Sequence, residues 1–170
     1  MTEYFDVVDS HDHVVGRATR DECHAKGLWH RGIHIVVVNS RNEILLQKRS
    51  MTKDLYKGYW TDAASGHVDS GEIYEQSAQR ELREELGVSA PLASLFDIKK
   101  RAGNDNELIR VFLARHDGPF TPDKDEIDRV QFFELGQITG MLKTEHFTPA
   151  TIEILEKIAA DHRLQKKLFS

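Results

Sequence analysis

Runs of β-branched and aliphatic residues, separated by polar turn residues, predict strands along most of the chain. The first two runs flank the polar tip Ser10 to His13 and predict an N-terminal hairpin. The third and fourth, joined by a turn at residues 39–42, predict central strands. The fifth and sixth form a further pair, and a loop at residues 117–125 leads to the last strand. The strands expected from these runs cover residues 4–8, 14–19, 33–38, 44–47, 95–101, 108–114 and 130–133.

Helical spacing appears in three places. Residues 20–26 predict a short helix that ends at Gly27, and a longer amphipathic stretch in the middle of the chain ends at Gly87. Thr148 and Pro149 suit the N-cap and first position of a C-terminal helix, with a core-facing stripe of Ile152, Leu155, Ile158 and Ala159. A strand-rich core with a middle helix and a closing helix is typical of an α/β layered domain. We expect one domain over residues 1–170, with a core at about 28–165 and residues 1–27 as an N-terminal hairpin and short helix.

The middle helix carries an acidic stripe. Glu81, Glu84 and Glu85 lie at positions i, i+3 and i+4, so the three carboxylates share one narrow face. Like charges so placed repel one another by a few tenths of a kcal/mol per pair, and a stripe that faces other protein groups therefore calls for a cation. Oxygen ligands without sulfur favour Mg²⁺ or Mn²⁺ over zinc. The stripe predicts a metal-binding helix.

The residues around the stripe indicate how it is held. Ala78, Leu82 and Leu86 form an adjoining apolar strip that suits docking on a sheet. Gly66 permits a close approach of the main chain to an ion, and its carbonyl is a candidate ligand. Arg80 can pair with Glu72 and hold the preceding loop. The alternative, a solvated and salt-bridged surface helix, explains the charge but neither the glycine nor the offset of Glu72.

Composition is that of an ordinary soluble enzyme. The chain has 170 residues, a formal net charge of −5 and a pI near 6.0. It therefore lacks the excess positive charge that favours binding to a nucleic acid polymer or an anionic membrane. Its single cysteine, Cys23, excludes an internal disulfide and suits a reducing compartment. The first residues resemble no signal peptide and no apolar run is long enough to span a bilayer. We expect a cytoplasmic protein with a small-molecule diphosphate partner, and a homodimer is compatible with the sequence.

Residues 66–88 resemble the Nudix box, Gly-x5-Glu-x7-Arg-Glu-U-x-Glu-Glu-x-Gly-U with U an aliphatic residue, at every defined position. The resemblance implies the Nudix fold, a mixed sheet between helices, and metal-dependent hydrolysis of a diphosphate linked to another moiety. It also implies that Glu81, Glu84 and Glu85 are the metal ligands. One local departure is Ile73, where the family often has a Ser or Thr N-cap. This departure concerns the first turn of the helix rather than the site.

Several stretches also resemble isopentenyl diphosphate isomerase, which shares the Nudix fold. The similar stretches are Leu28-Trp29-His30, Leu45 to Arg49, Gly58-Tyr59-Trp60 and Ser65-Gly66-His67. In that isomerase a cysteine that takes part in proton transfer precedes the Gly-His pair, and this chain has Ser65 there. A serine hydroxyl is a very poor acid or base near neutral pH, and the Nudix box is intact. A hydrolase is therefore favoured over an isomerase, and a diphosphate-binding module without turnover is a third alternative.

The isomerase resemblance implies a second metal position. Its metal-binding positions correspond here to His30, His67, Asp105 and Glu107, with His24 nearby in sequence. A strand places Asp105 and Glu107 on one face, and imidazole ligands would admit Zn²⁺ or Mn²⁺. The alternative is that both histidines are hydrogen-bonded structural residues. The other histidines at positions 11, 13 and 34 have no partner pattern and are expected to be structural or solvent-facing.

The remaining candidates concern catalysis and substrate binding. In Nudix enzymes the base that activates water usually lies outside the box, and Glu126 and Glu107 are the candidates here. Lys48, Arg49 and Lys53 form a basic strand end suited to substrate phosphates, or a solvated cluster. Aromatic residues that could stack on a nucleobase are Trp29, Tyr56, Tyr59 and Trp60. Nucleoside diphosphates, nucleotide sugars, dinucleotides and isoprenoid diphosphates all remain open as substrates.

Overall fold

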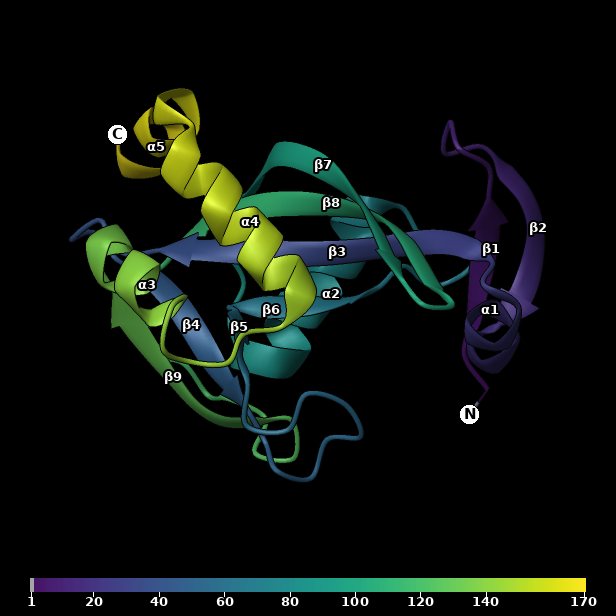
Figure 1. The fold of residues 1–170 in the computed structure, drawn as a ribbon, viewed down its shortest axis with the longest axis horizontal. Coiled ribbons are helices and arrows are strands. Elements are labelled where there is room, and N and C mark those ends of the chain that lie inside the picture. Colours follow the sequence, from purple (N-terminus) through teal and green to yellow (C-terminus); the bar gives the residue numbers. More distant parts are fainter. Residues whose placement is uncertain (1) are drawn as a thin grey trace.

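The computed structural model describes residues 2–170, and a seven-stranded mixed sheet lies at its centre (Figure 1). The strand order is β5-β4-β3-β8-β7, with β6 also paired to β3 and β9 to β4. The elements are β1 (Tyr4–Val8), β2 (Val14–Thr19), α1 (Arg20–Lys26), β3 (Trp29–Val38), β4 (Ile44–Arg49), β5 (Trp60–Asp62), β6 (Ala64–His67), α2 (Tyr74–Leu86), β7 (Leu92–Ala102), β8 (Asp105–Arg115), β9 (Ile127–Phe133), α3 (Leu135–Met141), α4 (Pro149–Ala160) and α5 (His162–Phe169).

Strand β3 organises the two layers of the core. Successive side chains of a strand point to opposite faces, so Ile33, Ile35 and Val37 pack with α2, whereas Val36 and Val38 pack with α4. Every residue from Ile33 to Val38 is buried, as expected of a strand covered on both faces. Figure 1 shows α4 crossing one face of the sheet, with α2 behind it. The expected α/β fold, a mixed sheet between helices, is confirmed.

The predicted strands are present, but several are longer than their apolar runs. The central strand begins at Trp29 rather than Ile33, because Trp29 to Gly32 pair with residues 106–109 of the parallel strand β8. The hairpin and the helix at residues 20–26 have the expected bounds. Strands β5 and β6 and helices α3 and α5 were not predicted. They are only three to eight residues long, and segments so short have little periodicity to detect.

The expected core stripe of the C-terminal helix was wrong in part. Leu155 and Ile158 are buried, but Ile152 and Ala159 are only half-buried, and Ile154 takes a core position instead. Thr151, a polar residue, is also fully buried on this face. Thr148 occupies the N-cap before Pro149, yet its side chain makes no bond to the helix backbone. It donates instead to the hydroxyls of other threonines, which alters the role expected for it.

Helix α2 is docked as its apolar strip predicts. Ala78, Leu82 and Leu86 are fully buried against the sheet. Gly87 ends the helix in the left-handed conformation, with φ of 69°, and its N–H donates to the carbonyl of Arg83. Ile73 provides no cap, but the first turn forms nevertheless because the Gln76 side chain accepts a hydrogen bond from the Ile73 N–H at 3.1 Å.

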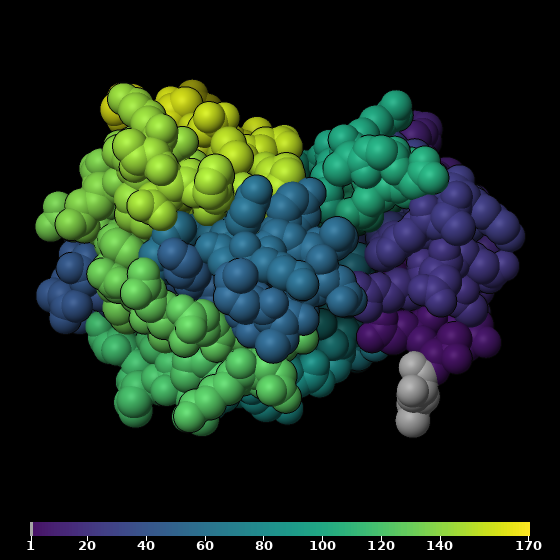
Figure 2. Space-filling model, turned by 60° about the horizontal axis from the view of Figure 1, so that its bottom comes forward, coloured from purple at the N-terminus to yellow at the C-terminus, as the bar shows by residue number. Residues whose placement is uncertain are grey.

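The segment between β4 and β5 is an irregular surface loop at residues 50–59. Figure 2 shows it in blue across the middle of one face, bordered by residues near 120–130 in green and by N-terminal residues in purple. Met51 and Leu55 of this loop are exposed. Among the described residues, no helix is long and apolar enough to cross a membrane.

Candidate metal-binding active site

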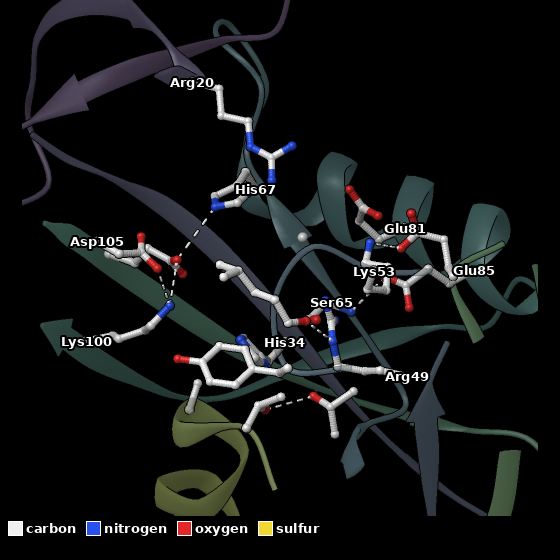
Figure 3. A pocket seen from close by; sticks show the side chains of 18 of the residues that line it. Arg20, His34, Arg49, Lys53, Ser65, His67, Glu81, Glu85, Lys100 and Asp105 are labelled. Atoms are coloured by element: carbon white, nitrogen blue, oxygen red, sulfur yellow. Dashed lines mark hydrogen bonds and ion pairs between the residues drawn. The ribbon is translucent and has the colours of Figure 1, made fainter. Parts of the chain in front are cut away.

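A cavity of about 410 Å³ opens between helix α2, the N-terminal elements β1 and α1, and the loop at residues 50–59. Its lining comes from elements far apart in sequence, including Arg20 of α1, His34 of β3, Glu81 of α2 and Lys100 of β7 (Figure 3). Nine carboxylate side chains and five lysine or arginine side chains line it. The cavity is therefore strongly polar and has more acidic than permanently basic groups.

The acidic stripe of α2 forms one wall of the cavity. Glu85 is only 8% exposed and accepts hydrogen bonds from the Gln47 amide at 2.6 Å and from the Ser65 N–H at 3.3 Å. Glu81 is half-buried beside it, whereas the Glu84 side chain is 60% exposed at the rim. The three predicted ligands thus line one cavity at different depths.

Gly66 and Arg80 hold the acidic stripe against β6. A side chain at Gly66 would overlap the Glu81 carboxylate, so glycine at this position lets that carboxylate lie against β6. Arg80 donates to Glu81 at 2.6 Å, to Glu72 at 3.1 Å and to the carbonyl of His67 at 3.2 Å. The expected pairing of Arg80 with Glu72 is present. Arg80 also ties the box to β6, which the sequence did not indicate.

Burial and mutual repulsion perturb the carboxylates of the stripe. Burial, together with the neighbouring charge of Glu81, raises the pKa of Glu85 to about 8. Burial also raises the pKa of Glu81, although the Arg80 guanidinium opposes this effect. The protein's own cations therefore do not fully compensate the two buried carboxylates. A divalent cation would compensate them, and the Gly66 cradle and the oxygen ligands fit a hard ion such as Mg²⁺ or Mn²⁺.

A second group of candidate ligands lies on another wall. His24, His30, His67 and Asp105 each offer one ligand atom, and these atoms all lie within 4.8 Å of one another. The Oδ1 atom of Asp105 is 3.7 Å from His24 Nε2 and 3.8 Å from His30 Nε2. Glu107 is not in this set and lies beside it, with Oε1 at 3.6 Å from His67 Nε2. The structure thus brings the predicted residues together, with His24 in the place expected for Glu107.

The imidazoles of this group are arranged as metal ligands usually are. Nδ1 of His30 donates to the Leu28 carbonyl at 3.0 Å, which leaves the Nε2 lone pair directed at Asp105. Burial lowers the pKa of His24 and of His30, which favours the neutral, metal-binding form. Among residues 2–170, His24 Nε2, His30 Nε2 and Asp105 Oδ1 are buried without a hydrogen-bond partner. These unsatisfied atoms fit a bound cation.

Lys100 occupies the side of this group away from the histidines. Its ammonium donates to Asp105 at 2.6 Å and to Glu107 at 3.0 Å (Figure 3). Although burial opposes the effect, His67 and Lys100 hold the pKa of Glu107 well below its ordinary value. Sequence reasoning did not single out Lys100. Lys100 is the register partner of Glu107 in the antiparallel pair of β7 and β8, and this register could not be read from the sequence.

The other predicted residues are only partly brought to the cavity. Arg49, Lys53 and Glu126 line it, and Lys53 forms an ion pair with Glu126. Lys48 does not line it, because neighbouring strand residues point to opposite faces. Its ammonium lies 5.3 Å from the Trp60 ring centroid instead.

Most of the candidate stacking residues pack elsewhere. Tyr59 stacks on His146, Trp60 packs edge-on against Phe133, and Arg101 lies over Trp29. Of the four aromatic candidates, only Tyr56 lines the cavity. His34, expected to be structural or exposed, is buried and also lines it.

Comparison with known proteins agrees with this geometry. Residues 28–155 match the NUDIX domain family. The chain is 33% identical over 147 residues to isopentenyl-diphosphate Delta-isomerase 2 of Photorhabdus laumondii, covering 84% of this chain and 83% of the relative. It is 32% identical over 155 residues to the uncharacterized Nudix hydrolase YfcD of Escherichia coli K12, covering 91% and 85%. The crystal structure of DR0079 from Deinococcus radiodurans superimposes with a TM-score of 0.80 at 22% identity, covering 91% and 98% of the two chains, which supports the fold. The chain therefore belongs to the NUDIX domain family, and the expected Nudix hydrolase, an enzyme of phosphoanhydride bonds, is confirmed at the level of that family.

Proposed function

We propose that the cavity hydrolyses the phosphoanhydride bond of a small-molecule diphosphate, with Mg²⁺ or Mn²⁺ held by Glu81, Glu84, Glu85 and the carbonyl of Gly66. One observation carries this proposal. The carboxylates of Glu81 and Glu85 have pKa values raised by burial, so the protein's own cations do not balance their charge, and Glu81 packs against Gly66 of β6. A divalent cation bound there supplies charge neutralisation of the phosphoryl oxygens and acidification of water.

The chain's own residues position these groups. Gln47 and the Ser65 N–H hold the two oxygens of Glu85, and Arg80 holds Glu81, so the carboxylates are oriented before substrate arrives. Arg80 also donates to Glu72 and to the His67 carbonyl, and these bonds hold α2 against β6. Arg49 and Lys53 line the same cavity and are placed to contact substrate phosphates.

Glu126 is the better of the two candidates for the base that orients or deprotonates water. Its side chain is 42% exposed in the cavity and has one partner, Lys53. Glu107 is only 8% exposed in its side chain and is engaged by Lys100, with His67 nearby. A buried carboxylate whose pKa is held well below its ordinary value is a weaker proton acceptor than an exposed carboxylate with one lysine partner.

The histidine and Asp105 group supports a second cation position. Its three imidazoles and its unsatisfied buried atoms suit Zn²⁺ or Mn²⁺, with His24, His30, His67 and Asp105 as ligands. Glu107 then serves as a neighbouring carboxylate that orients His67.

Isomerisation of isopentenyl diphosphate is the second candidate function, favoured by that histidine group and by the similarity to isomerases. The presence of Ser65 makes isomerisation less favoured than hydrolysis. The residue lines the cavity directly before Gly66, and its hydroxyl is a poor proton donor or acceptor near neutral pH. Hydrolysis needs no thiol at this position.

The remaining parts of the proposal concern context. One domain over residues 1–170 is supported by α1 and β1, whose Arg20, His24 and Phe5 line the same cavity as α2. A net charge of −5 supports a small-molecule partner rather than a nucleic acid polymer. Cys23, a buried free thiol, is compatible with the reducing cytoplasm.

The test is a phosphate-release assay with Mg²⁺ and with Mn²⁺ across nucleoside diphosphates, nucleotide sugars, dinucleotides and isoprenoid diphosphates. We expect hydrolysis of at least one class, and loss of at least about a hundredfold in Glu81→Gln, because the amide cannot supply the ligand charge. Circular dichroism of the same preparation establishes that the variant is folded. Activity of Glu81→Gln near that of the wild type would refute the proposed metal site.

A further inference from the structure

A buried histidine and aspartate pair on the sheet has no role in the proposed metal chemistry. His34 of β3 is 8% exposed and Asp62 of β5 is 1% exposed. Nδ1 of His34 is 2.8 Å from Oδ1 and 3.0 Å from Oδ2 of Asp62, so the carboxylate accepts from Nδ1–H with both oxygens. An ion pair removed from water to this degree is costly unless further bonds support it.

Threonine hydroxyls supply that support. Thr151 of α4 donates to Asp62 Oδ1 at 2.7 Å, and Thr61 donates to the same atom at 3.0 Å. The Asp62 N–H in turn donates to Thr151 at 3.2 Å. These contacts explain why α4 buries a threonine in its core face. They also fix Asp62, and through it the plane of the His34 ring.

The other nitrogen of His34 is directed to the cavity. His34 lines the cavity, and no hydrogen bond of its Nε2 is present among residues 2–170. Figure 3 shows the ring between Lys100 on one side and Arg49 on the other. His34 is also the register partner of Ser65, whose N–H donates to Glu85. The ring therefore faces the same cavity as the acidic stripe and the second ligand group.

The permanent cations of the cavity are already engaged. Arg20, Lys53, Arg80 and Lys100 each have at least one carboxylate partner, and Nε of Arg49 donates to the Leu55 carbonyl. A diphosphate bound through a cation at the acidic stripe or at the histidine group would thus meet few hydrogen-bond donors that have no other partner. His34 is nine-tenths buried, rigidly held and has its second nitrogen unpartnered.

We propose that His34, oriented by Asp62, is a binding residue whose Nε2–H donates a hydrogen bond to a phosphoryl oxygen of the bound diphosphate. This inference deepens the proposed function, on which it rests for the chemical class of the ligand. A charged imidazole donor suits an anionic oxygen better than any neutral group of the substrate.

The charges around the ring favour the protonated form that such a donor needs. Burial by itself lowers the pKa of His34, but the Asp62 carboxylate outweighs burial and holds the pKa above its ordinary value. Glu107 of β8 acts in the same direction, and Lys100 of β7 opposes it. Arg49 of β4 is a further charged group beside the ring (Figure 3). Hydroxyls face the pair from α4.

The experiment measures binding of methylenediphosphonate, a diphosphate that cannot be hydrolysed at its bridge, by calorimetry in the presence of Mg²⁺. We expect His34→Ala to weaken binding by about 10- to 100-fold, the size of a charged hydrogen bond. Asp62→Asn should weaken it similarly, because a neutral ring that donates through Nδ1 offers only a lone pair at Nε2. His34→Gln retains a neutral donor and should recover part of the affinity.

Thr151→Val is the matched control, since it disturbs the same buried network without lining the cavity. It should lower thermal stability, and because the Asp62 carboxylate can still accept from Nδ1–H of His34, it should weaken binding by less than Asp62→Asn does. Circular dichroism establishes folding, and His34→Gln covers the case in which His34→Ala does not fold.

Three results would overturn the inference: unchanged affinity in a folded His34 variant, an equal loss in Thr151→Val, or no binding of the probe by the wild type. If the wild type binds the probe but hydrolyses no member of the substrate panel, the proposed hydrolysis fails and the His34 contact stands. If hydrolysis occurs and His34→Gln and His34→Ala both bind as the wild type does, only the His34 contact fails.

Discussion

Replacing Glu85 by glutamine should stabilise the metal-free protein while removing most of its activity. Glu85 is buried and next to Glu81, and burial together with that charge raises its pKa to about 8. Glutamine has nearly the same shape but no charge. The substitution therefore removes an unfavourable buried charge that, in the proposed function, is present only to bind a cation.

The size of the effect follows from proton linkage. Because the folded pKa lies above the unfolded value near 4.5, the folded state holds the proton more tightly. Stability therefore falls as pH rises from about 4.5 to about 8. At pH 7 this shift costs about 3 kcal/mol, and at pH 5 it costs less than about 1 kcal/mol. Glutamine keeps the bond from Gln47 but gives up one acceptor for the Ser65 N–H, at about 1 kcal/mol. The net gain at pH 7 is about 2 kcal/mol.

The assay is thermal denaturation of chelator-treated protein at pH 5 and pH 7. A gain of about 2 kcal/mol corresponds to roughly 4 to 8 °C in Tm for a chain of this length, and it should disappear at pH 5. Glu84→Gln is the matched control, because this side chain is 60% exposed on the same helix and its loss should change the free energy of unfolding by less than about 0.5 kcal/mol. Added Mg²⁺ should stabilise the wild type and not Glu85→Gln. A metal-free Glu85→Gln protein that is less stable than the wild type at pH 7 would refute this electrostatic account.

Three further outcomes can be measured directly. Isopentenyl diphosphate incubated with the protein and Mg²⁺ should yield no dimethylallyl diphosphate by proton NMR, because Ser65 lacks a thiol; a useful rate of isomer formation would overturn the preference for hydrolysis. The double variant His30→Ala with His67→Ala should lose roughly one equivalent of tightly held Zn²⁺ or Mn²⁺ by elemental analysis. Acidification of the wild type should release the same ion, since imidazole binds metal only when neutral. Equal metal content in the wild type and the double variant would make these histidines structural. Asp62→Asn should lower the free energy of unfolding most between about pH 4 and pH 6.5, as urea titrations can measure. The Asp62 pKa is lowered, so its contribution is lost as pH falls, and the His34 pKa is raised, so its contribution is lost as pH rises through that value; a cost that does not change with pH would contradict the ion pair.

The acidic stripe could be predicted from sequence because its geometry is local. Residues three and four apart on a helix must share a face, and the apolar strip beside them determines which face docks on the sheet. Gly66 was recognisable for a similar reason, since a close approach of backbone and helix tolerates no side chain. These inferences required only one helix and one neighbouring strand.

The second ligand group could be predicted only in part because it is assembled from separate elements. Its residues come from α1, β3, β6 and β8. Sequence spacing could indicate that Asp105 and Glu107 share a strand face, but not which of them would face the imidazoles. His24 comes from the N-terminal helix, whose position against the sheet no periodicity reveals. The indication available from the sequence was that His24 lies close to His30 along the chain.

The buried pair of His34 and Asp62 was missed because polar residues in a core contradict the rule by which core residues are chosen. Thr151 was passed over in favour of Ile152 for the same reason, although its hydroxyl bonds to Asp62 inside the core. A polar group can be buried when every donor and acceptor is satisfied, and a single sequence does not reveal such partners. Errors of this kind concentrate near functional sites, where polar side chains are kept inside at a cost to stability.

The charge balance of the cavity connects these observations. Nine carboxylates against five lysine or arginine side chains would repel a diphosphate, and at least four of those cations are already paired with carboxylates. Cations bound at the acidic stripe, and at the histidine group if it binds metal, would reverse the sign of the local field. A hydrogen-bond donor with no other partner then matters more than another permanent charge, because it engages the ligand without first breaking an ion pair. His34 meets that condition, which is why its contribution should appear in diphosphate affinity and should depend on the divalent cation being present.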